Sequence, residues 1–482
     1  MRIEEHPILT FKKGRKVEFS FDGEKMWGYE GEPIAAALHA NGVRVLRRSI
    51  KLNRPRGFYC AIGNCSSCLM KVNGEPNVKV CVEKLKEDMV VETQKGKGDL
   101  STAKISPVSS SREGKRIRKT DIAVIGAGPA GLLAAISAHQ MGAKVTLLDR
   151  DSKLGGQLIK QTHMFFGSEE QYASIRGIDI ADILANKLDR EKTDIMLDAT
   201  VVGYYREDGV LGIEQNNRFI KIKPERIIVA TGASERVLAF PNNDLPGIYG
   251  AGAAQTLMNE HGVVPGDNVL MVGAGNIGLI VSYQLMQAGI NVKAIIDAAP
   301  KIGGYWVHAS KVRRLGVPIY TSYTVKEAYG KENLEKVTIW ELDEDWQPLK
   351  GTEMDLDVDV ICIAVGLSPL AELLWQAGCQ MKYIPELGGH TPVRDEDMQT
   401  TTKGIYVAGD VAGVEEASSA MVEGSLAGLC AAKSLGYDTG RFKELKKEAI
   451  NQLKGLRSGP VSEGIRKGLK QLIELRRKSK ND

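Results

Sequence analysis

Four of the seven cysteines lie close together near the N-terminus, and their spacing is typical of a metal-cluster site. Cys60, Cys65 and Cys68 follow the pattern C-x4-C-x2-C, and Cys81 comes next along the chain. In a reducing compartment, clustered thiols are more often metal ligands or redox groups than structural disulfides. Four thiolates in this order match the plant-type ligand pattern of a [2Fe–2S] cluster. Zinc or an empty site is the alternative, but zinc sites favour C-x2-C pairs over this triplet.

The small residues of the cysteine loop suit three ligands that converge on one cluster. Residues 57–70 read GFYCAIGNCSSCLM, and Gly63 is free to adopt the positive φ that a tight bend needs. We expect backbone N–H groups of residues 62–67 to donate to the sulfurs, which raises the reduction potential of a bound cluster. Arg54 and Arg56 flank the loop, and we expect them on a solvated face rather than against an acidic partner.

A glycine-rich motif after the cysteine region predicts a dinucleotide-binding unit. Gly126, Gly128 and Gly131 form G-x-G-x-x-G between the strand-like run DIAVI and an apolar helix. Asp149 ends the next strand, where its carboxylate would hold a ribose hydroxyl pair. The glycines permit a tight turn, close approach of a pyrophosphate and helix–strand packing. The pyrophosphate would lie at the helix N-terminus, where free N–H groups and the helix dipole favour an anion.

The same motif occurs a second time. Gly273, Gly275 and Gly278 follow the run NVLMV, and Asp297 ends the next strand. An acidic residue there suits a free 2′-hydroxyl and repels a 2′-phosphate, so this unit is predicted to prefer NAD over NADP. The alternative is a domain that keeps the fold without its ligand.

Changes of pattern along the chain predict an α/β protein with two nested Rossmann-like dinucleotide-binding domains and an N-terminal α+β domain. Strand-like runs, NVKVCV among them, surround one helical stretch in the N-terminal part, and a segment rich in Gly, Ser, Lys and Arg follows. The predicted boundaries are 1–95 for the [2Fe–2S] domain, 96–119 for a linker, 120–245 with 360–436 for the first dinucleotide domain, 246–359 for the second, and 437–482 for a basic tail of two amphipathic helices.

Composition excludes several classes of protein. The 482 residues are 43% hydrophobic and 26% charged, which is an ordinary globular composition for more than one domain. A net charge of +4 is too mild for nucleic-acid binding, and 6% aromatic residues provide no stacking platform. No stretch approaches the roughly 20 apolar residues that a membrane span needs. The N-terminus has no apolar signal region, so we expect a cytoplasmic protein.

The two glycine motifs in this order resemble the two-dinucleotide-binding-domain flavoproteins of the pyridine nucleotide–disulfide oxidoreductase type. Four further segments carry the resemblance: LGGQL at 154–158, IIVATGAS at 227–234, ICIAVGLSP at 361–369 and GIYVAGD at 404–410. The resemblance implies FAD in the first domain, with Asp410 bonding its ribityl chain and the helix near Ala417–Ala420 pointing its N-terminus at the isoalloxazine. Cys362, Cys379 and Cys430 have no partner at redox spacing, which departs from the disulfide reductases and argues against disulfide reduction.

The motifs and the resemblance together assign the site residues. For FAD they are Gly126, Ala127, Gly128, Pro129, Ala130, Gly131, Asp149, Arg150, Gly155, Gly156, Gln157, Val201, Thr231, Gly232, Gly409 and Asp410. For NAD they are Gly273, Gly275, Asn276, Gly278 and Asp297. The metal ligands are Cys60, Cys65, Cys68 and Cys81. No side chain is assigned as a catalytic acid or base, and electron transfer needs none.

The N-terminal stretch from GEPIAAALHANGV to Cys81 resembles the small [2Fe–2S] ferredoxin-like domain of sarcosine oxidase, dye-linked proline dehydrogenase and hydrogen cyanide synthase-type α subunits. LGGQLIKQTHMFFGS at 154–168 looks like the same subfamily. This implies an electron-transferring α subunit of a heteromeric amino-acid or amine dehydrogenase or oxidase. Its partner would be a D-amino-acid-oxidase-like flavoprotein β subunit with its own FAD, and FMN can lie at the interface between the subunits of such complexes.

Several alternatives stay open at this point. ATP or NAD can occupy the place of FAD in some relatives of this type. The chain could be a self-sufficient NADH-dependent reductase that passes electrons through FAD and the cluster to an external acceptor. It could also be a non-catalytic nucleotide-binding scaffold whose partner does all the chemistry.

Overall fold

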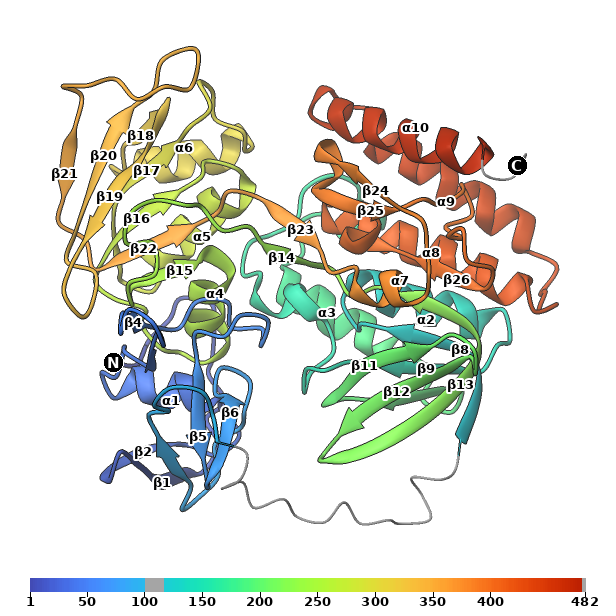
Figure 1. Cartoon of the computed structure of the whole chain (residues 1–482). Helices are drawn as coiled ribbons and strands as arrows, with labels where there is room; N and C mark the ends of the chain where they lie inside the picture. Colours follow the sequence, from blue (N-terminus) through green and yellow to red (C-terminus); the bar gives the residue numbers. More distant parts are fainter. Residues whose placement is uncertain (100–116, 479–482) are drawn as a thin grey trace. The chain divides into compact units, whose positions relative to one another are not determined.

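The computed structural model describes residues 1–99 and 117–478. They form two compact units, one from residues 1–99 and 235–366 and the other from residues 117–234 and 367–478. The chain passes between the units at β14 (Ala233–Glu235) and β23 (Leu367–Pro369), two strands that pair with each other (Figure 1). Most of the predicted linker, residues 100–116, lies outside the described residues. No helix of the described parts is both long and apolar enough to cross a membrane.

The N-terminal part of the first unit is a mixed sheet that packs on helix α1. The strand order is β2-β1-β7-β5-β6, and the small β3–β4 hairpin lies outside it. The elements are β1 (Lys16–Phe21), β2 (Glu24–Tyr29), α1 (Ile34–Ala40), β3 (Arg47–Arg48), β4 (Pro55–Arg56), β5 (Leu69–Val72), β6 (Glu75–Lys79) and β7 (Val90–Glu92). The strand predicted over NVKVCV is wrong at its end, because β6 stops at Lys79. A turn follows, in which the Val82 N–H donates to the Lys79 carbonyl, and Cys81 lies in that turn.

The second part of this unit is a parallel sheet in the order β15-β22-β16-β17-β18, next to an antiparallel sheet in the order β19-β20-β21. Continuous apolar runs such as VICI of β22 are buried along their whole length, as expected for strands covered on both faces. The elements are β15 (Ile248–Gly250), α4 (Ala251–Gln255), β16 (Asn268–Val272), α5 (Asn276–Gln287), β17 (Asn291–Asp297), α6 (Trp306–Arg314), β18 (Ile319–Thr321), β19 (Tyr323–Tyr329), β20 (Lys336–Glu341), β21 (Met354–Leu356) and β22 (Val360–Ile363).

The other unit has a sheet in the order β10-β9-β8-β13-β12-β11, and β26 pairs with β13. The strands are β8 (Ile117–Ile125), β9 (Val145–Leu148), β10 (Thr193–Met196), β11 (Ala199–Tyr205), β12 (Val210–Gln215), β13 (Arg218–Val229), β24 (Met381–Ile384), β25 (Gly389–Pro392) and β26 (Ile405–Val407). The helices are α2 (Pro129–Gln140), α3 (Gly177–Asn186), α7 (Glu372–Gln376), α8 (Ala417–Lys433), α9 (Phe442–Leu456) and α10 (Glu463–Lys478).

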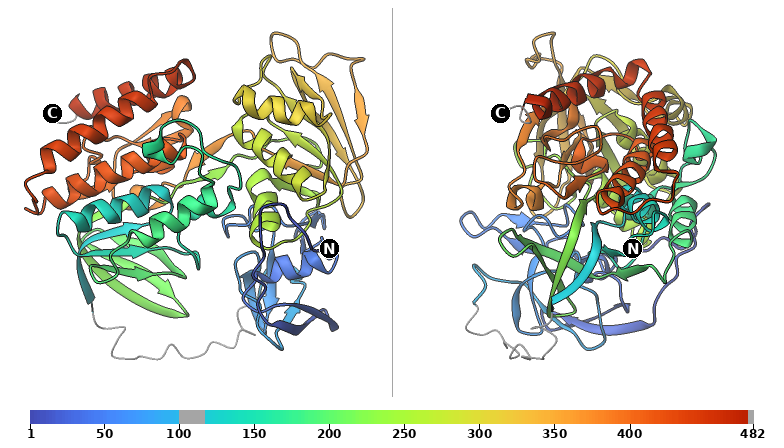
Figure 2. Two further views of the ribbon diagram at one scale, coloured as in Figure 1. Left: turned by 180° about the vertical axis from the view of Figure 1, so that it is seen from behind. Right: turned by 90° about the vertical axis from the view of Figure 1, so that its right-hand side faces the viewer.

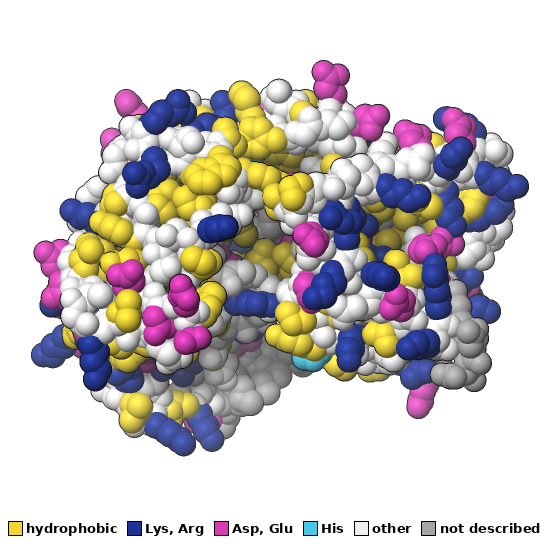
Figure 3. All heavy atoms as spheres, turned by 90° about the horizontal axis from the view of Figure 1, so that it is seen from above, with side chains coloured by type: hydrophobic (Ala, Val, Ile, Leu, Met, Phe, Trp, Pro, Cys, Tyr) yellow, Lys and Arg dark blue, Asp and Glu magenta, His cyan; other side chains and the backbone are white. Residues whose placement is uncertain are grey.

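The C-terminal segment forms two helices that cover the body of this unit. Helix α9 buries Ala449 and Leu453 against the main core, and α10 buries Leu469 and Leu472 against Ile384 and neighbouring residues. On the face seen in Figure 3, the Lys and Arg side chains of this unit are interspersed with Asp and Glu. The basic composition of these helices therefore does not make one continuous positive surface there.

Helices α2 and α8 approach each other so closely that their backbones touch. A Cβ atom added to Gly424 would lie 2.0 Å from the Ala130 carbonyl oxygen, and one added to Gly428 would lie 2.3 Å from that of Ala134. Helix α8 lies between α2 and α9, as the view from behind in Figure 2 shows. Only glycine permits this distance between the two helices.

We expect Gly428→Ala to lower the free energy of unfolding by about 2–3 kcal/mol, because the new methyl group forces α8 away from α2. Gly455→Ala in α9 is the matched control, since a Cβ there meets nothing within 4 Å. Alanine is the better helix former, so the control should gain about 0.5–1 kcal/mol. Urea unfolding followed by circular dichroism measures both, and equal effects in the two variants would contradict the backbone contact.

Candidate functional site

The four predicted cluster ligands come together in the N-terminal domain. Cys60, Cys65 and Cys68 lie in the loop before β5, and Cys81 lies in the turn after β6. Strands β5 and β6 are antiparallel neighbours, which brings Cys68 close to Cys81. The thiol of Cys60 interacts with those of Cys65 and Cys81, and the thiol of Cys68 interacts with that of Cys81. Two linked pairs of thiols are the donor set that a two-iron cluster requires.

Backbone N–H groups face the cysteine sulfurs, as the loop sequence predicts. The Cys65 N–H donates to the Cys60 sulfur at 3.5 Å, the Ile62 N–H also donates to Cys60, and the Ser67 N–H donates to Cys65. Gly63 has the expected positive φ, at +66°. Hydrogen bonds from the Cys65 and Cys81 thiols hold the pKa of Cys60 well below its usual value, whereas the shared thiol hydrogen bonds and burial raise the pKa of Cys65 and Cys81. The backbone N–H donors are therefore the feature that suits the loop to thiolate sulfurs.

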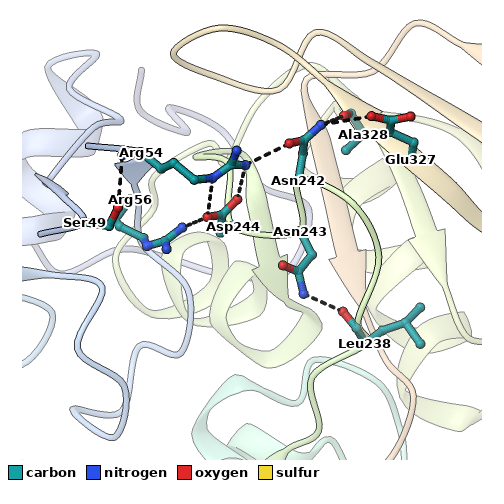
Figure 4. A network of polar contacts seen from close by, with 9 residues as sticks. All are labelled: Ser49, Arg54, Arg56, Leu238, Asn242, Asn243, Asp244, Glu327 and Ala328. Carbon is teal, nitrogen blue, oxygen red and sulfur yellow. Dashed lines mark hydrogen bonds and ion pairs between the residues drawn. The ribbon is translucent and has the colours of Figure 1, made fainter. Parts of the chain in front are cut away.

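Arginines of the β3–β4 hairpin tie the cysteine domain to the part of the same unit formed by residues 235–366 (Figure 4). This part begins before the predicted boundary at residue 246. Arg54 donates to Asp244 through Nε at 2.8 Å and through Nη2 at 2.6 Å, and Arg56 also pairs with Asp244. Arg54 Nη2 further donates to Asn242 Oδ1 at 2.9 Å. The expectation of a solvated face was wrong, because the acidic partner lies far along the same chain.

The predicted FAD-site residues gather at one edge of the sheet in the other unit. Strands β8, β9, β13 and β26 are parallel, and their last residues stand in register: Ile125, Leu148, Val229 and Val407. The segments that follow these strands therefore meet at the carboxyl edge. They carry Gly126, Asp149, Thr231 and Gly409.

The first glycine motif has the geometry that its sequence predicts. Gly126 has φ +103°, and a Cβ on Gly131 would lie 1.7 Å from the Gly126 carbonyl oxygen, so the helix packs directly on the turn. A Cβ on Gly128 would meet only the Gly156 Cα, at 4.0 Å. Helix α2 begins at Pro129 with no side-chain cap. Its first N–H groups are thus left for an anion that approaches over Gly128.

Asp149 lies at the position predicted for a ribose ligand. Its Oδ2 accepts the Ala127 N–H and its Oδ1 accepts the Asp151 N–H at 2.8 Å. Burial raises the pKa of this carboxyl to about 6. Each carboxylate oxygen has a further acceptor site, so the two backbone bonds do not prevent binding of hydroxyl groups. The carboxylate therefore both fixes the turn and remains available to a ligand.

Asp410 combines a buried setting with some solvent access. Among the described residues its hydrogen-bond donor is the Glu415 N–H, at a long 3.4 Å. Burial raises the pKa of the carboxyl to about 7, and the carboxylates of Glu423 and Glu415 act in the same direction. A half-buried carboxylate with so weak a partner is suited to accept a hydrogen bond from a ligand hydroxyl.

The remaining predicted residues surround these groups. Gly155 donates its N–H to the Ala127 carbonyl at 2.9 Å, and Gly156 and Gln157 begin the short helix that follows. Thr231 Oγ1 donates to the Leu370 carbonyl at 2.7 Å, and Gly232 accepts the Leu370 N–H.

Two further predicted residues lie less directly at the edge. Arg150 lies beside Asp151 on the surface. Val201 lies in β11, whose first residue, Ala199, donates its N–H to the Asp149 carbonyl at 2.8 Å.

A buried ion network behind Asp410 could not be predicted from the sequence. Glu423 accepts the Gly409 N–H at 3.1 Å, Arg394 Nη2 at 2.7 Å and Arg457 Nη2 at 2.6 Å. Arg457 also donates to Glu415, at 2.7 and 3.0 Å. The side chains of Arg394 and Glu423 are only 4% and 3% exposed. The sequence signal for this network is Glu423, a glutamate among the mostly small and apolar residues of the helix ASSAMVEGSLAGLCAAK.

The second glycine motif repeats the geometry of the first. Gly273 has φ +113°, a Cβ on Gly278 would lie 1.9 Å from the Gly273 carbonyl oxygen, and a Cβ on Gly275 would meet nothing within 4 Å. Asp297 accepts the N–H groups of Ala274 and Ala299 at 2.6 and 2.8 Å, as Asp149 accepts those of Ala127 and Asp151.

A loop that follows Asp297 extends this internal repeat. DAAPKIGGYW at 297–306 matches DRDSKLGGQL at 149–158, a signal that the glycine motifs alone do not reveal. Gly304 donates its N–H to the Ala274 carbonyl at 2.9 Å. Asn276, predicted as a ligand residue, accepts the Tyr305 N–H of this loop through Oδ1 at 2.8 Å.

We expect Cys68→Ala to lose most of its iron and its iron–sulfur absorption, because it removes one of the four thiolates. Cys379→Ala is the matched control, since this buried thiol bonds Thr400 Oγ1 in the other unit. Iron analysis and the visible spectrum measure both variants. A Cys68→Ala protein with a full iron content would contradict the ligand set.

We expect Arg457→Met to cost about 3 kcal/mol of unfolding free energy, because two buried carboxylates lose a guanidinium. FAD binding should weaken several-fold as well, since Glu423 also holds the Gly409 N–H. Arg441→Met is the matched control, because its pair with Glu444 is exposed and contributes little to stability. Urea unfolding and fluorescence titration with FAD measure these effects. Equal FAD affinity in the two variants would contradict the role given to the network.

Comparison with known proteins supports both cofactor domains. The family described as pyridine nucleotide-disulphide oxidoreductase matches residues 120–424, and a 2Fe-2S iron-sulfur cluster binding domain matches residues 14–96. The alpha subunit of sarcosine oxidase from Corynebacterium sp. (strain P-1) is 27% identical over 470 residues, which cover 90% of this chain and 45% of that protein. One subunit of opine oxidase from Agrobacterium tumefaciens (strain Ach5) is 29% identical over 333 residues, 65% of this chain and 66% of that protein.

Solved structures agree with these matches. L-proline dehydrogenase from P. horikoshii superposes with a TM-score of 0.70 at 26% identity, over 92% of this chain and 79% of that one. Thioredoxin reductase of T. acidophilum shares the fold at 23% identity and a TM-score of 0.54, over 66% of this chain. The chain spans less than half the length of the sarcosine oxidase polypeptide it matches. The chain thus belongs to the pyridine nucleotide-disulphide oxidoreductase family, as a flavin-dependent oxidoreductase with an N-terminal 2Fe–2S cluster-binding domain.

Proposed function

We propose that the chain is the electron-transferring subunit of a heteromeric dehydrogenase or oxidase that oxidises an amino acid or amine. The observation that carries the proposal is the cysteine loop, which adds a one-electron centre to a flavoprotein body. A bound flavin accepts electrons as a pair and releases them singly. In the part of the chain that the structure describes, the cysteines other than the four cluster ligands are Cys362, Cys379 and Cys430, all buried, so the proposal routes electrons through the cluster rather than a dithiol.

The residues of this chain have binding roles in this proposal. The first N–H groups of α2 would hold the pyrophosphate of FAD, and Asp149 would accept its ribose hydroxyls. Asp410 would accept a hydroxyl of the ribityl chain, and the network through Glu423 and Arg457 would keep the Asp410 loop in place. Cys60, Cys65, Cys68 and Cys81 would hold the cluster, with the loop N–H groups on their sulfurs.

The substrate class follows from what the relatives' names share. Sarcosine, opines and proline are all α-amino acids with a secondary amine, and the relatives are named for oxidising them. Two of these relatives are named as subunits of oxidases. We therefore propose a secondary amino acid as substrate, bound on a flavoprotein partner of the D-amino-acid-oxidase type, with this chain as electron acceptor for that partner. FMN at the interface with that partner belongs to the same proposal.

A self-sufficient NADH-dependent reductase is the second candidate. The observation that favours it is the second glycine motif, where Gly275 is open to a ligand and Asp297 repeats the arrangement of Asp149. In that case NADH would supply the electrons directly and no amine-oxidising partner would be needed.

We expect the chain, when purified with its native partner, to be reduced anaerobically by sarcosine or L-proline and not by L-alanine, a primary amine. The isolated chain should respond to none of the three, because the substrate site lies on the partner. Bleaching of the flavin bands and the iron–sulfur shoulder measures the reaction. Reduction of the isolated chain by an amino acid, or a complex that no secondary amine reduces, would contradict the proposal.

A further inference from the structure

A hollow of about 380 Å³ lies beside the cysteine loop, within the N-terminal domain. Ser66 and Ser67 form part of its wall, and they occupy the positions between the ligands Cys65 and Cys68. The opposite wall comes from the β3–β4 hairpin, whose connecting residues run from Ser49 to Arg54. Two residues of its wall are thus the direct sequence neighbours of the cluster ligands Cys65 and Cys68.

Positive charge gathers around this hollow. Arg47, Lys51 and Arg56 line it, and no acidic side chain does so among the described residues. Neither Arg47 nor Lys51 forms an ion pair with a described carboxylate, whereas Arg56 shares Asp244 with Arg54. Burial lowers the pKa of Arg56, and the neighbouring guanidinium groups add to this effect. Arg47 and Lys51 thus place positive charge at the hollow without a described carboxylate in an ion pair with either, and this favours a bound anion.

The hairpin also presents apolar surface at the rim. Ile50 and Leu52 line the hollow and are 55% and 74% exposed, on either side of Lys51. Such exposure of two aliphatic side chains next to cations is typical of a site for a ligand with an apolar body and a charged group.

Hydrogen bonds join the two walls of the hollow and hold the turn of the hairpin. Arg47 Nη1 donates to the Ser66 carbonyl at 3.0 Å, which joins the hairpin to the cysteine loop. Within the hairpin, the Asn53 N–H donates to the Ser49 carbonyl and the Arg54 N–H donates to Ser49 Oγ, both at 3.0 Å. A preformed site of this kind binds without the entropic cost of ordering a loop.

The two cysteines nearest the start of the loop are the more accessible ones. Cys60 and Cys65 are half-buried, whereas Cys68 and Cys81 are buried. Electron transfer between two centres weakens steeply with the distance between them. A redox molecule in the hollow, beside Ser66, would lie next to the accessible ligand Cys65.

We propose that this hollow binds a small anionic electron acceptor, with its charged group against Arg47, Lys51 and Arg56 and its apolar body against Ile50 and Leu52. Cys60, Cys65, Cys68 and Cys81 would hold the cluster, and a reduced cluster there would supply one electron to the acceptor, so that the cluster would be oxidised by one electron and the acceptor reduced by one. No covalent bond forms or breaks in this step. The inference rests on the proposed function, because it requires a cluster on the four cysteines.

The binding part of the proposal is tested with hexacyanocobaltate(III), a redox-inert trianion, in calorimetric titrations of the iron-loaded chain at low salt. Lys51→Gln should weaken binding about fivefold to tenfold, since a unit charge next to a trianion is lost. Lys51 is exposed in the hairpin turn, and in the described part of the chain its side chain forms none of the hydrogen bonds that hold the hairpin. Lys25→Gln is the matched control, because Lys25 lies on β2, the edge strand at the opposite end of the sheet from β6, and is 87% exposed.

The electron-transfer part is tested by reoxidation of the dithionite-reduced chain in stopped flow. Ferricyanide, an anion, should react about tenfold more slowly with Lys51→Gln than with the parent chain at low salt, and high salt should remove the difference. Hexaammineruthenium(III), a cation, should react no more slowly with the variant. The control Lys25→Gln should behave as the parent chain with both oxidants.

Three results would overturn the inference: equal hexacyanocobaltate binding by Lys51→Gln and Lys25→Gln, no measurable binding by the parent chain, or slowing of both oxidants alike. These outcomes differ from failure of the proposed function. A chain that lacks iron or its visible absorption would refute the cluster itself, and the spectrum is recorded before each titration. With the spectrum intact, insensitivity to Lys51 counts against the hollow alone, and an acceptor that docks elsewhere, such as a protein, would then be the explanation.

Discussion

The backbone contact between α2 and α8 is the constraint on which the nucleotide site of this protein depends. Helix α2 begins at the first glycine motif, and α8 follows the loop that contains Asp410. Gly424 and Gly428 let the two helices touch at carbonyl distance, and this fixes the spacing between the two parts of the site. A larger residue at either position would push α8 away from α2.

The buried ion network belongs to the same contact. Glu423 is the residue before Gly424, so the close approach of the helices also places its carboxylate where it accepts the Gly409 N–H. Arg457, at the end of α9, completes the network from the C-terminal segment. Burial of two arginines and two glutamates is costly unless each charge is paired, and here every charge is paired. The C-terminal helices therefore contribute to the geometry of the flavin site from behind it.

The cysteine site depends on a different set of contacts. Its loop is short and rich in small residues, so its own sequence determines the bend and the N–H donors. Its attachment to the part of the same unit formed by residues 235–366 rests on Arg54, Arg56 and Asp244, and also on the Tyr59 carbonyl, which accepts the Gly250 N–H at 3.1 Å. The bend and the N–H donors of the loop are local features of its sequence. The attachment, in contrast, joins residues that lie far apart in the sequence.

This difference explains what the sequence could and could not predict. The glycine motifs, the terminal aspartates and the cysteine spacing are local patterns with a fixed structural meaning, and the family and cofactor predictions built on them are confirmed. The partner of Arg54, the Glu423 network and the end of β6 before Cys81 depend on tertiary contacts or on one hydrogen bond in a turn. The similarity of DAAPKIGGYW to DRDSKLGGQL can also be found in the sequence. It becomes visible only when the alignment of the two glycine motifs is continued past Asp149 and Asp297.

Electron supply by a partner is tested most directly by the anaerobic visible spectrum of the isolated chain before and after addition of NADH, with dithionite as the positive control. If a partner that oxidises an amino acid supplies the electrons, the flavin bands and the iron–sulfur shoulder are bleached by dithionite and left unchanged by NADH. Rapid bleaching of both centres by NADH would contradict that claim and would make the chain a reductase in its own right.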